Sequence, residues 1–125
     1  MSTKLHDFAR QAILGGGLTP RTVTTTITGS AADLITGDGR CVAVQQVGAV
    51  SGTTPVLAGK IQESADSSTW TDISGATFTN VSAADNVQAI TFDRTQRYVR
   101  AAFTLGGSSP SADVCIAVGQ QKKTI

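Results

Sequence analysis

Short runs of alternating apolar and polar residues dominate the sequence from residue 21 onward. In "RTVTTTITG", Val23 and Ile27 alternate with threonines, and "VQAITFD", "RYVRAAFTL" and "DVCIAVGQ" continue the pattern. A period of two is typical of strands with one face on a core and the other in solvent. Turn residues, as in "GDGR", "SGTTP" and "GGSSPSA", separate about eight such runs at intervals of about a dozen residues. The pattern therefore predicts an all-β fold, an antiparallel, jelly-roll-like β-sandwich.

Residues 4–14, "KLHDFARQAIL", carry apolar side chains at helical rather than alternating spacing. This spacing predicts a short amphipathic helix or an apolar arm, and the glycines at 15–17 predict a hinge after it. Because so short a helix is marginal in water, either its own domain or a neighbouring subunit must bury its apolar stripe. We expect an arm with this hinge over residues 1–20, a β-sandwich over 21–120 and a tail over 121–125. The interface candidates in the arm are Leu5, Phe8 and Ile13.

The only tryptophan lies in "KIQESADSSTWTDI", where two alternating runs flank the polar tip Ala65–Ser68. This pattern predicts a β-hairpin with Trp70 and Ile73 on the returning strand. The favoured interpretation places the Trp70 ring over the end of the core, because tryptophan buries a large area and keeps its N–H at the edge. The alternative is an exposed platform on which a sugar stacks, flanked by Asp66 and Asp72.

Charge and hydropathy narrow the range of partners. Ten basic and nine acidic side chains give a net charge of +1, whereas a nucleic-acid-binding protein usually carries a strong basic stripe. We therefore expect no nucleic-acid partner. No apolar run approaches the length of about 18 residues that a membrane span needs, and polar residues interrupt the N-terminal segment, so we expect neither a membrane span nor a signal peptide. Cys41 and Cys115 lie in apolar runs and are predicted to be buried free thiols.

The sequence contains no recognisable catalytic or metal-binding pattern. His6 is the only histidine and has no companion at ligand spacing, which makes a poor zinc site. "TGDGR" lacks the ending and the following helix of a phosphate-binding loop and predicts a turn. Asp66 and Asp72 lack the alternating oxygen ligands of a calcium loop, and nothing indicates the cleft of a glycosidase. We therefore expect no enzyme activity, no cofactor and no metal.

Two longer runs carry a resemblance to a known group of proteins. "KIQESADSSTWTDISGATFTNV" and "RYVRAAFTLGGSSPSADVCIAVGQQ" resemble small β-rich virion proteins encoded near the capsid genes of tailed bacteriophages, and the similarity covers roughly residues 56–120. The resemblance implies a capsid decoration (cement) protein that assembles on the outer surface of the head and clamps neighbouring capsomers. It implies no catalytic residues. The implied partners are the major capsid protein and the protein itself, as a homotrimer or, second, a dimer.

The same resemblance implies a place on the capsid surface of the virion for a protein made in the host cytoplasm. Alternation along "YVRAAFTL" puts Tyr98 and Arg100 on the face opposite Val99, Ala101 and Phe103. Because tyrosine and arginine are enriched at interfaces, Tyr98 and Arg100 are further interface candidates, with an ordinary solvated strand face as the alternative. Two rival functions remain: a phage tail or head-completion protein, and a carbohydrate-binding β-sandwich that uses Trp70.

Overall fold

The computed structural model describes residues 12–15 and 17–122, and these residues form strands, turns and loops without a helix. The all-β prediction is therefore confirmed for this part of the chain. The strands are β1 (Ala12–Leu14), β2 (Leu18–Val23), β3 (Ile27–Thr28), β4 (Ala32–Asp33), β5 (Gly37–Ser64), β6 (Thr71–Thr77), β7 (Asn86–Phe92) and β8 (Tyr98–Lys122).

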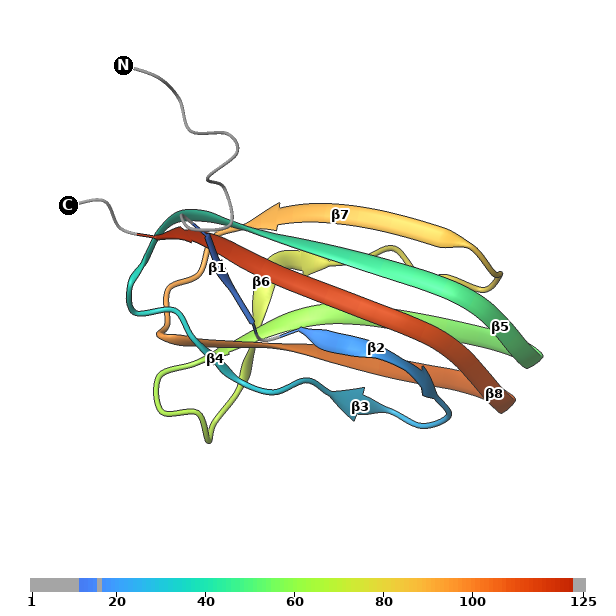
Figure 1. Ribbon diagram of the computed structural model, residues 1–125. Coiled ribbons are helices and arrows are strands. Elements are labelled where there is room, and N and C mark those ends of the chain that lie inside the picture. The colour runs from blue at the N-terminus through green and yellow to red at the C-terminus, as the bar shows by residue number, and fades with distance from the viewer. Residues whose placement is uncertain (1–11, 16, 123–125) are drawn as a thin grey trace, which may run out of the picture.

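Strands β5 and β8 form one long antiparallel ribbon that bends in the middle (Figure 1). Their pairing runs from Gly37 opposite Lys122 to Ser64 opposite Tyr98, with shifts of register around the bend. The sequence predicted separate strands joined by loops at "SGTTP" and "GGSSPSA". The structure corrects this prediction, because both segments stay in the ribbon and bend together.

The bend divides the ribbon between two packed sheets. The first sheet contains β7, the first half of β5, the last half of β8, and β1 with β2. The second contains β6, the last half of β5, the first half of β8, and β3 with β4. The chain has eight segments when β1 with β2 and β3 with β4 each count as one, and β5 and β8 each count as two. With the segments numbered in chain order, their orders in the two sheets are 1-8-3-6 and 2-7-4-5. This is the order of a jelly roll, and it confirms the predicted sandwich.

The core lies between the two sheets and follows the alternation along each strand. In the first half of β8, Val99, Ala101 and Phe103 are fully buried, as predicted. In the last half, the even-numbered Val114, Ile116 and others face the core instead. The parity changes because the bend contains irregular pairing between the two halves. The largest fully buried side chains are Phe78, Phe92, Phe103, Leu18, Leu34, Leu57, Ile61 and Ile116.

The helix predicted over residues 4–14 is wrong for Ala12–Leu14, which pair with Gly119–Gln121 as a strand. Residues 18–20 of the predicted arm likewise belong to β2. The glycines beside them approach β8 closely: Gly15 donates its N–H to the Val118 carbonyl at 3.0 Å, and a Cβ at Gly17 would lie 1.9 Å from the Ile116 oxygen. Leu5, Phe8 and most of the predicted helix lie outside the described residues.

Arg94 closes the end of the sandwich at which β5 begins. Its guanidinium donates hydrogen bonds to the carbonyl oxygens of Leu34, Gly37 and Gln96, and its Nε donates to Gln120 Oε1 at 2.8 Å. Because five donors lie in one plane, a single arginine can satisfy several carbonyls at once. The contacts join the turn before β5, the turn before β8 and the end of β8.

Candidate interaction surfaces

The outer face of the second sheet carries a chain of polar contacts, which we call the polar face and define by Lys60, Gln62, Trp70, Asp72 and Arg100. Arg100 Nε donates to Gln62 Oε1 at 2.9 Å, and Gln62 Nε2 donates to Asp72 Oδ1 at 2.9 Å. Lys60 Nζ reaches the other oxygen of Asp72 at 3.0 Å. These contacts cross β8, β5 and β6, so residues predicted as two alternative sites form one surface.

Trp70 lies on this polar face and not in the core. The Arg100 guanidinium carbon is 4.4 Å from the centre of the Trp70 ring, a cation–π contact that covers one side of the ring. Trp70 is half-buried, whereas Ile73, three residues later, is buried. The interpretation that Trp70 covers the end of the core is therefore wrong, and Ile73 alone of the two reaches the core. One side of the ring is also unavailable to a stacking sugar.

The carboxylates beside Trp70 already have partners within the chain. Asp66 Oδ1 accepts hydrogen bonds from the N–H groups of Thr69 at 3.0 Å and Ser68 at 2.9 Å, and from the Ser64 hydroxyl. These bonds hold the pKa of Asp66 below its usual value, and the bond from Thr69 has the largest effect. Hydrogen bonds from Gln62 and then Lys60 lower the pKa of Asp72 in the same way. The hairpin prediction holds, and Asp66 organises its tip.

Tyr98 and Arg100 both point outward, as the alternation predicted, and both are half-buried. The guanidinium carbon of Arg97 is 5.2 Å from the centre of the Tyr98 ring. Arg97 also binds both oxygens of Asp33, at 2.9 and 2.7 Å, and this contact lowers the pKa of Asp33. The structure thus shows contacts within the chain for these residues, and their role as interface residues stays a prediction.

The outer face of the first sheet is different in character, and we call it the apolar face. Leu14 is 72% exposed, Val87 68% and Val42 41%. Between them Val44 is flanked across the sheet by Ala89 and Ala117. The apolar face comprises Leu14, Val42, Val44, Val87, Ala89 and Ala117.

Leu14 is the outward residue of β1, whereas Ile13, the predicted interface residue, is half-buried against the core. Alternation alone does not predict the apolar face, because an alternating run is typical of a strand with one solvated face. The signal was present in "CVAVQQV", where residues at both parities are apolar: Cys41 and Ala43 face inward, and Val42 and Val44 face outward.

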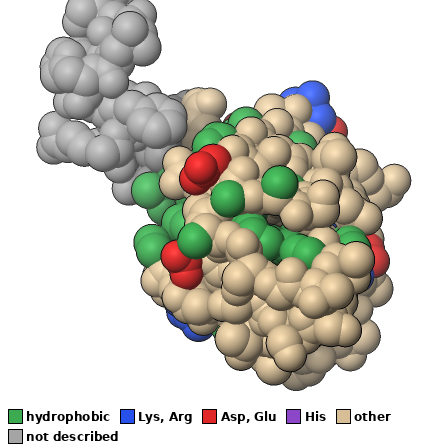
Figure 2. All heavy atoms as spheres, turned by 90° about the vertical axis from the view of Figure 1, so that its right-hand side faces the viewer, with side chains coloured by type: hydrophobic (Ala, Val, Ile, Leu, Met, Phe, Trp, Pro, Cys, Tyr) green, Lys and Arg blue, Asp and Glu red, His purple; other side chains and the backbone are tan. Residues whose placement is uncertain are grey.

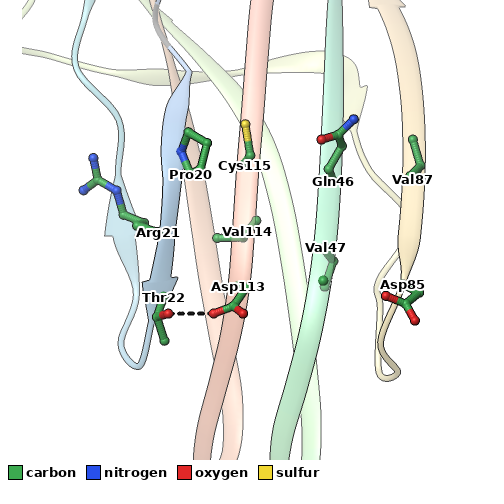
Figure 3. A pocket seen from close by; sticks show the side chains of 11 residues that line it. Pro20, Arg21, Thr22, Gln46, Val47, Asp85, Val87, Asp113, Val114 and Cys115 are labelled. Carbon is green, nitrogen blue, oxygen red and sulfur yellow. Dashed lines mark hydrogen bonds between the residues drawn. The ribbon is translucent and has the colours of Figure 1, made fainter.

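A groove of about 690 Å³ lies near the bend beside the apolar face and shares Val87 with it (Figure 3). Its side chains come from β2, β8, β5 and β7, and Gln46, Cys115 and Val87 are among them. Thr22 Oγ1 donates to Asp113 Oδ1 at 2.6 Å along one side. Figure 2 shows the end of the molecule at the bend, where a band of hydrophobic side chains runs between polar atoms. The groove adds concave surface beside the apolar face.

Both cysteines are free thiols, as predicted, but only Cys41 is fully buried. Burial raises the pKa of the Cys41 thiol, which makes it a poor nucleophile at neutral pH. Cys115 is half-buried in the groove. Over residues 12–15 and 17–122, no group of three His, Cys, Asp or Glu side chains is arranged to hold a metal ion. His6 lies outside this part of the chain.

No helix within the described ranges is long and apolar enough to cross a membrane.

No protein-family model matches the chain, and no curated protein matches it. Among solved structures it is similar to the PBSX exported protein XepA, with 18% identity and a TM-score of 0.61 over 91% of this chain and 38% of that one. A structure of infectious bursal disease virus, Gx strain, matches with 18% identity and a TM-score of 0.47 over 91% of this chain and 32% of that one. The disulfide-linked pili of Bacillus endospore appendages match with 16% identity and a TM-score of 0.35, over 85% of this chain and 91% of that one.

The similarity to XepA extends over nearly all of this chain, and at this identity it is a similarity of fold. The chain spans less than two-fifths of the length of XepA. The fold is thus found as part of a larger protein.

Proposed function

We propose that this chain is a structural, non-enzymatic virion protein of a tailed phage, a capsid decoration (cement) protein on the outer surface of the head. It binds the major capsid protein and stabilises contacts between capsomers, with neither nucleic acid nor membrane as a partner. The resemblance over residues 56–120 supports this proposal. The jelly-roll fold is compatible with it, since rigid sandwiches suit a repeated clamp.

The apolar face is the observation that carries the proposal. Large exposed apolar side chains gathered on one sheet are unusual in a monomer and mark sites of protein association. Leu14, Val42 and Val87 lie on such a sheet, with the small side chains of Ala89 and Ala117 among them. An exposed apolar surface suits a broad contact with another protein, and many such contacts repeated over a capsid lattice reinforce each other.

The test is co-sedimentation of the purified protein with cognate expanded, empty phage heads. We expect wild-type protein to sediment with the heads and Val42→Asp to bind about tenfold more weakly or worse, because a buried unpaired charge opposes the contact. Thr104→Asp is the matched control, since Thr104 is exposed on the opposite sheet. Wild-type protein that ignores the heads, or a Val42→Asp variant that binds them as well as wild type, contradicts the proposal.

The same experiment separates the rivals. A tail or head-completion protein would sediment with tails, or only with heads that lack their neck, and would form rings or tubes. A carbohydrate-binding module would bind a glycan array and lose that binding in Trp70→Ala. The Arg100 contact on Trp70 and the occupied oxygens of Asp66 and Asp72 favour the virion role over the carbohydrate role.

A further inference from the structure

Each sheet of a sandwich has two edges, and most edges in this molecule are protected against pairing with another chain. Strand β6 has a break in register and a left-handed Gly75 (φ 82°). Strand β2 contains Pro20 and Arg21 and also breaks register. Strand β1 has three residues, and β3 and β4 have two each. Bulges, proline, charge and short length are the usual means by which proteins block open edges.

Strand β7 is the exception. Its seven residues, "NVQAITF", include no proline, glycine or charged side chain. It pairs with β5 without a break, from Asn86 opposite Val47 to Phe92 opposite Cys41. In Figure 1 it lies along the margin of the first sheet with no strand beyond it. A regular, uncharged edge of this kind is a template for an additional strand.

One hydrogen bond identifies the backbone groups on that open edge. The Asp85 N–H donates to the Gly48 carbonyl at 3.0 Å, so Asp85 directs its backbone toward β5. Because antiparallel pairing alternates, the backbone groups of the even-numbered residues, Asn86 to Phe92, point away from β5. No backbone hydrogen bond joins that edge to another segment in the part of the chain that the structure describes.

The side chain of Gln88 holds β7 in place without using the edge. Its amide exchanges two hydrogen bonds of 2.8 Å with the backbone of Thr79, in the segment that follows β6. This contact ties the margin of the first sheet to the second sheet. The strand is therefore fixed in a regular conformation while its outer backbone groups stay available, and a fixed edge loses little entropy when it pairs.

We infer that β7 pairs antiparallel with β7 of a second copy, about a two-fold axis at Ala89. The register centred on Ala89 is the one that pairs every even-numbered residue of the strand. It places Ala89 opposite itself and Val87 opposite Thr91, small or β-branched pairs that suit neighbouring strands. A two-fold contact needs a self-complementary surface, and an uncharged strand with a small central residue provides one.

The pairing has a consequence for the proposed function. The inference rests on that function in one respect only, namely that a structural protein must contact its neighbours. The pairing joins the first sheets of the two copies into one sheet and sets their apolar faces side by side. Val87, 68% exposed in one copy, then lies next to the partner strand. The combined surface would engage two capsid sites at once, which strengthens binding by effective concentration. The geometry thus points to the dimer and not to the trimer that the sequence favoured.

The ends of the paired strands carry a further signature of this register. Asp85 of one copy would lie opposite Asp93 of the second copy, and like charges directly opposite each other weaken strand pairing. Asp93 is 3.3 Å from Arg40 of its own chain, which offsets part of its charge. Removal of the other charge by Asp85→Asn should therefore tighten the dimer.

The first experiment measures the mass of the full-length protein by light scattering, without heads. We expect twice the mass of one chain for wild type and the mass of one chain for Ala89→Lys, because the two-fold axis sets lysine opposite lysine. Ala117→Lys is the matched control: Ala117 is exposed on the same face but lies on the central strand β8. This variant should remain a dimer.

The second experiment is cysteine cross-linking in a Cys115→Ala background with diamide, which accepts the two electrons and two protons lost by a pair of thiols. Ala89→Cys should form a covalent dimer, and Thr91→Cys, on the same face of the same strand, should not, since it faces residue 87. A wild-type monomer, a trimer unaffected by Ala89→Lys, or equal cross-linking of both variants overturns the inference. Because these measurements use isolated protein, their failure is distinguishable from failure to bind heads.

Discussion

At the scale of single residues, Gln45 is the side chain most at odds with its surroundings. It is fully buried among apolar residues, and neither its Nε2 nor its Oε1 has a hydrogen-bond partner among the described residues. Gly59 on the facing half of β5 makes room for it, since a Cβ there would lie 2.0 Å from Oε1. A buried amide without partners lowers stability by about 1–3 kcal/mol.

We expect Gln45→Met to raise the free energy of unfolding by about 1–3 kcal/mol, because methionine keeps the shape and removes the unpaired polar atoms. Urea denaturation followed by Trp70 fluorescence measures the change. The neighbouring Gln46→Met is the control; Gln46 is exposed, and its replacement should change stability by about 0.5 kcal/mol or less. A Gln45→Met protein less stable than wild type would show that the amide has a partner.

Alternation along the sequence was sufficient to place Val99, Ala101 and Phe103 inside and Tyr98 and Arg100 outside. It could not identify Gln45 as a core residue, although Gln45 shares the parity of Cys41 and Ala43. The space for its amide comes from Gly59 after the bend, a contact across the sandwich that no local pattern records. The polar face could not be predicted for the same reason, since Arg100 contacts Trp70, which lies 30 positions earlier in the sequence.

At the scale of elements, the bend in β8 depends on a glycine. Gly107 has φ 108°, and a Cβ there would lie 2.7 Å from the Thr54 carbonyl oxygen of the facing strand. Both the backbone angle and the close approach exclude a larger residue. Gly106, its neighbour in the same bend, has no such angle, and a Cβ there would meet Val56 only at 3.9 Å.

Gly107→Ala should therefore lower the free energy of unfolding by about 1–3 kcal/mol, the range for strained backbone at such a φ. Gly106→Ala should change it far less, because an ordinary contact distance is available. Thermal unfolding monitored by circular dichroism compares the two variants. Equal losses for both would mean that the chain can bend without the left-handed residue.

The sequence predicted loops at "SGTTP" and "GGSSPSA" because of their composition, and both are indeed where the chain changes direction. Composition does not reveal that the two segments bend beside each other and continue the ribbon. The strand Ala12–Leu14 was missed because its partner, Gly119–Gln121, lies at the other end of the sequence. Its residues happen to continue a helical spacing that begins at Leu5, and the distant pairing decides the outcome.

At the scale of the whole molecule, acidic side chains link separate parts of the sandwich. Asp33 of β4 binds Arg97 just before β8, Asp72 of β6 binds Gln62 and Lys60 of β5, and the pKa of each carboxyl is lowered in the folded state. A carboxyl whose pKa is lowered by folding stabilises the folded state at any pH above its pKa in the unfolded chain. That stabilisation is lost as the pH falls through its pKa in the folded state.

The melting temperature should therefore stay nearly constant from about pH 7 to pH 5 and fall below about pH 4, near the unfolded pKa of aspartate. Differential scanning calorimetry across this range measures the effect. Asp33→Asn should start from a lower melting temperature and lose less on acidification, because one of the linked groups no longer titrates. A melting temperature that rises in acid would contradict the assignment of these pairs.

The central position of β8 also bears on how the chain is made. Within the described residues, β1, β2, β3 and β4 pair with β8 alone, and β8 is the last strand in the sequence. A ribosome releases the early strands first, so they have no partner until β8 follows. The sandwich can therefore close only after synthesis has passed β8, and a chain that stops before Tyr98 yields unpaired apolar strands, prone to aggregate, in place of a smaller fold.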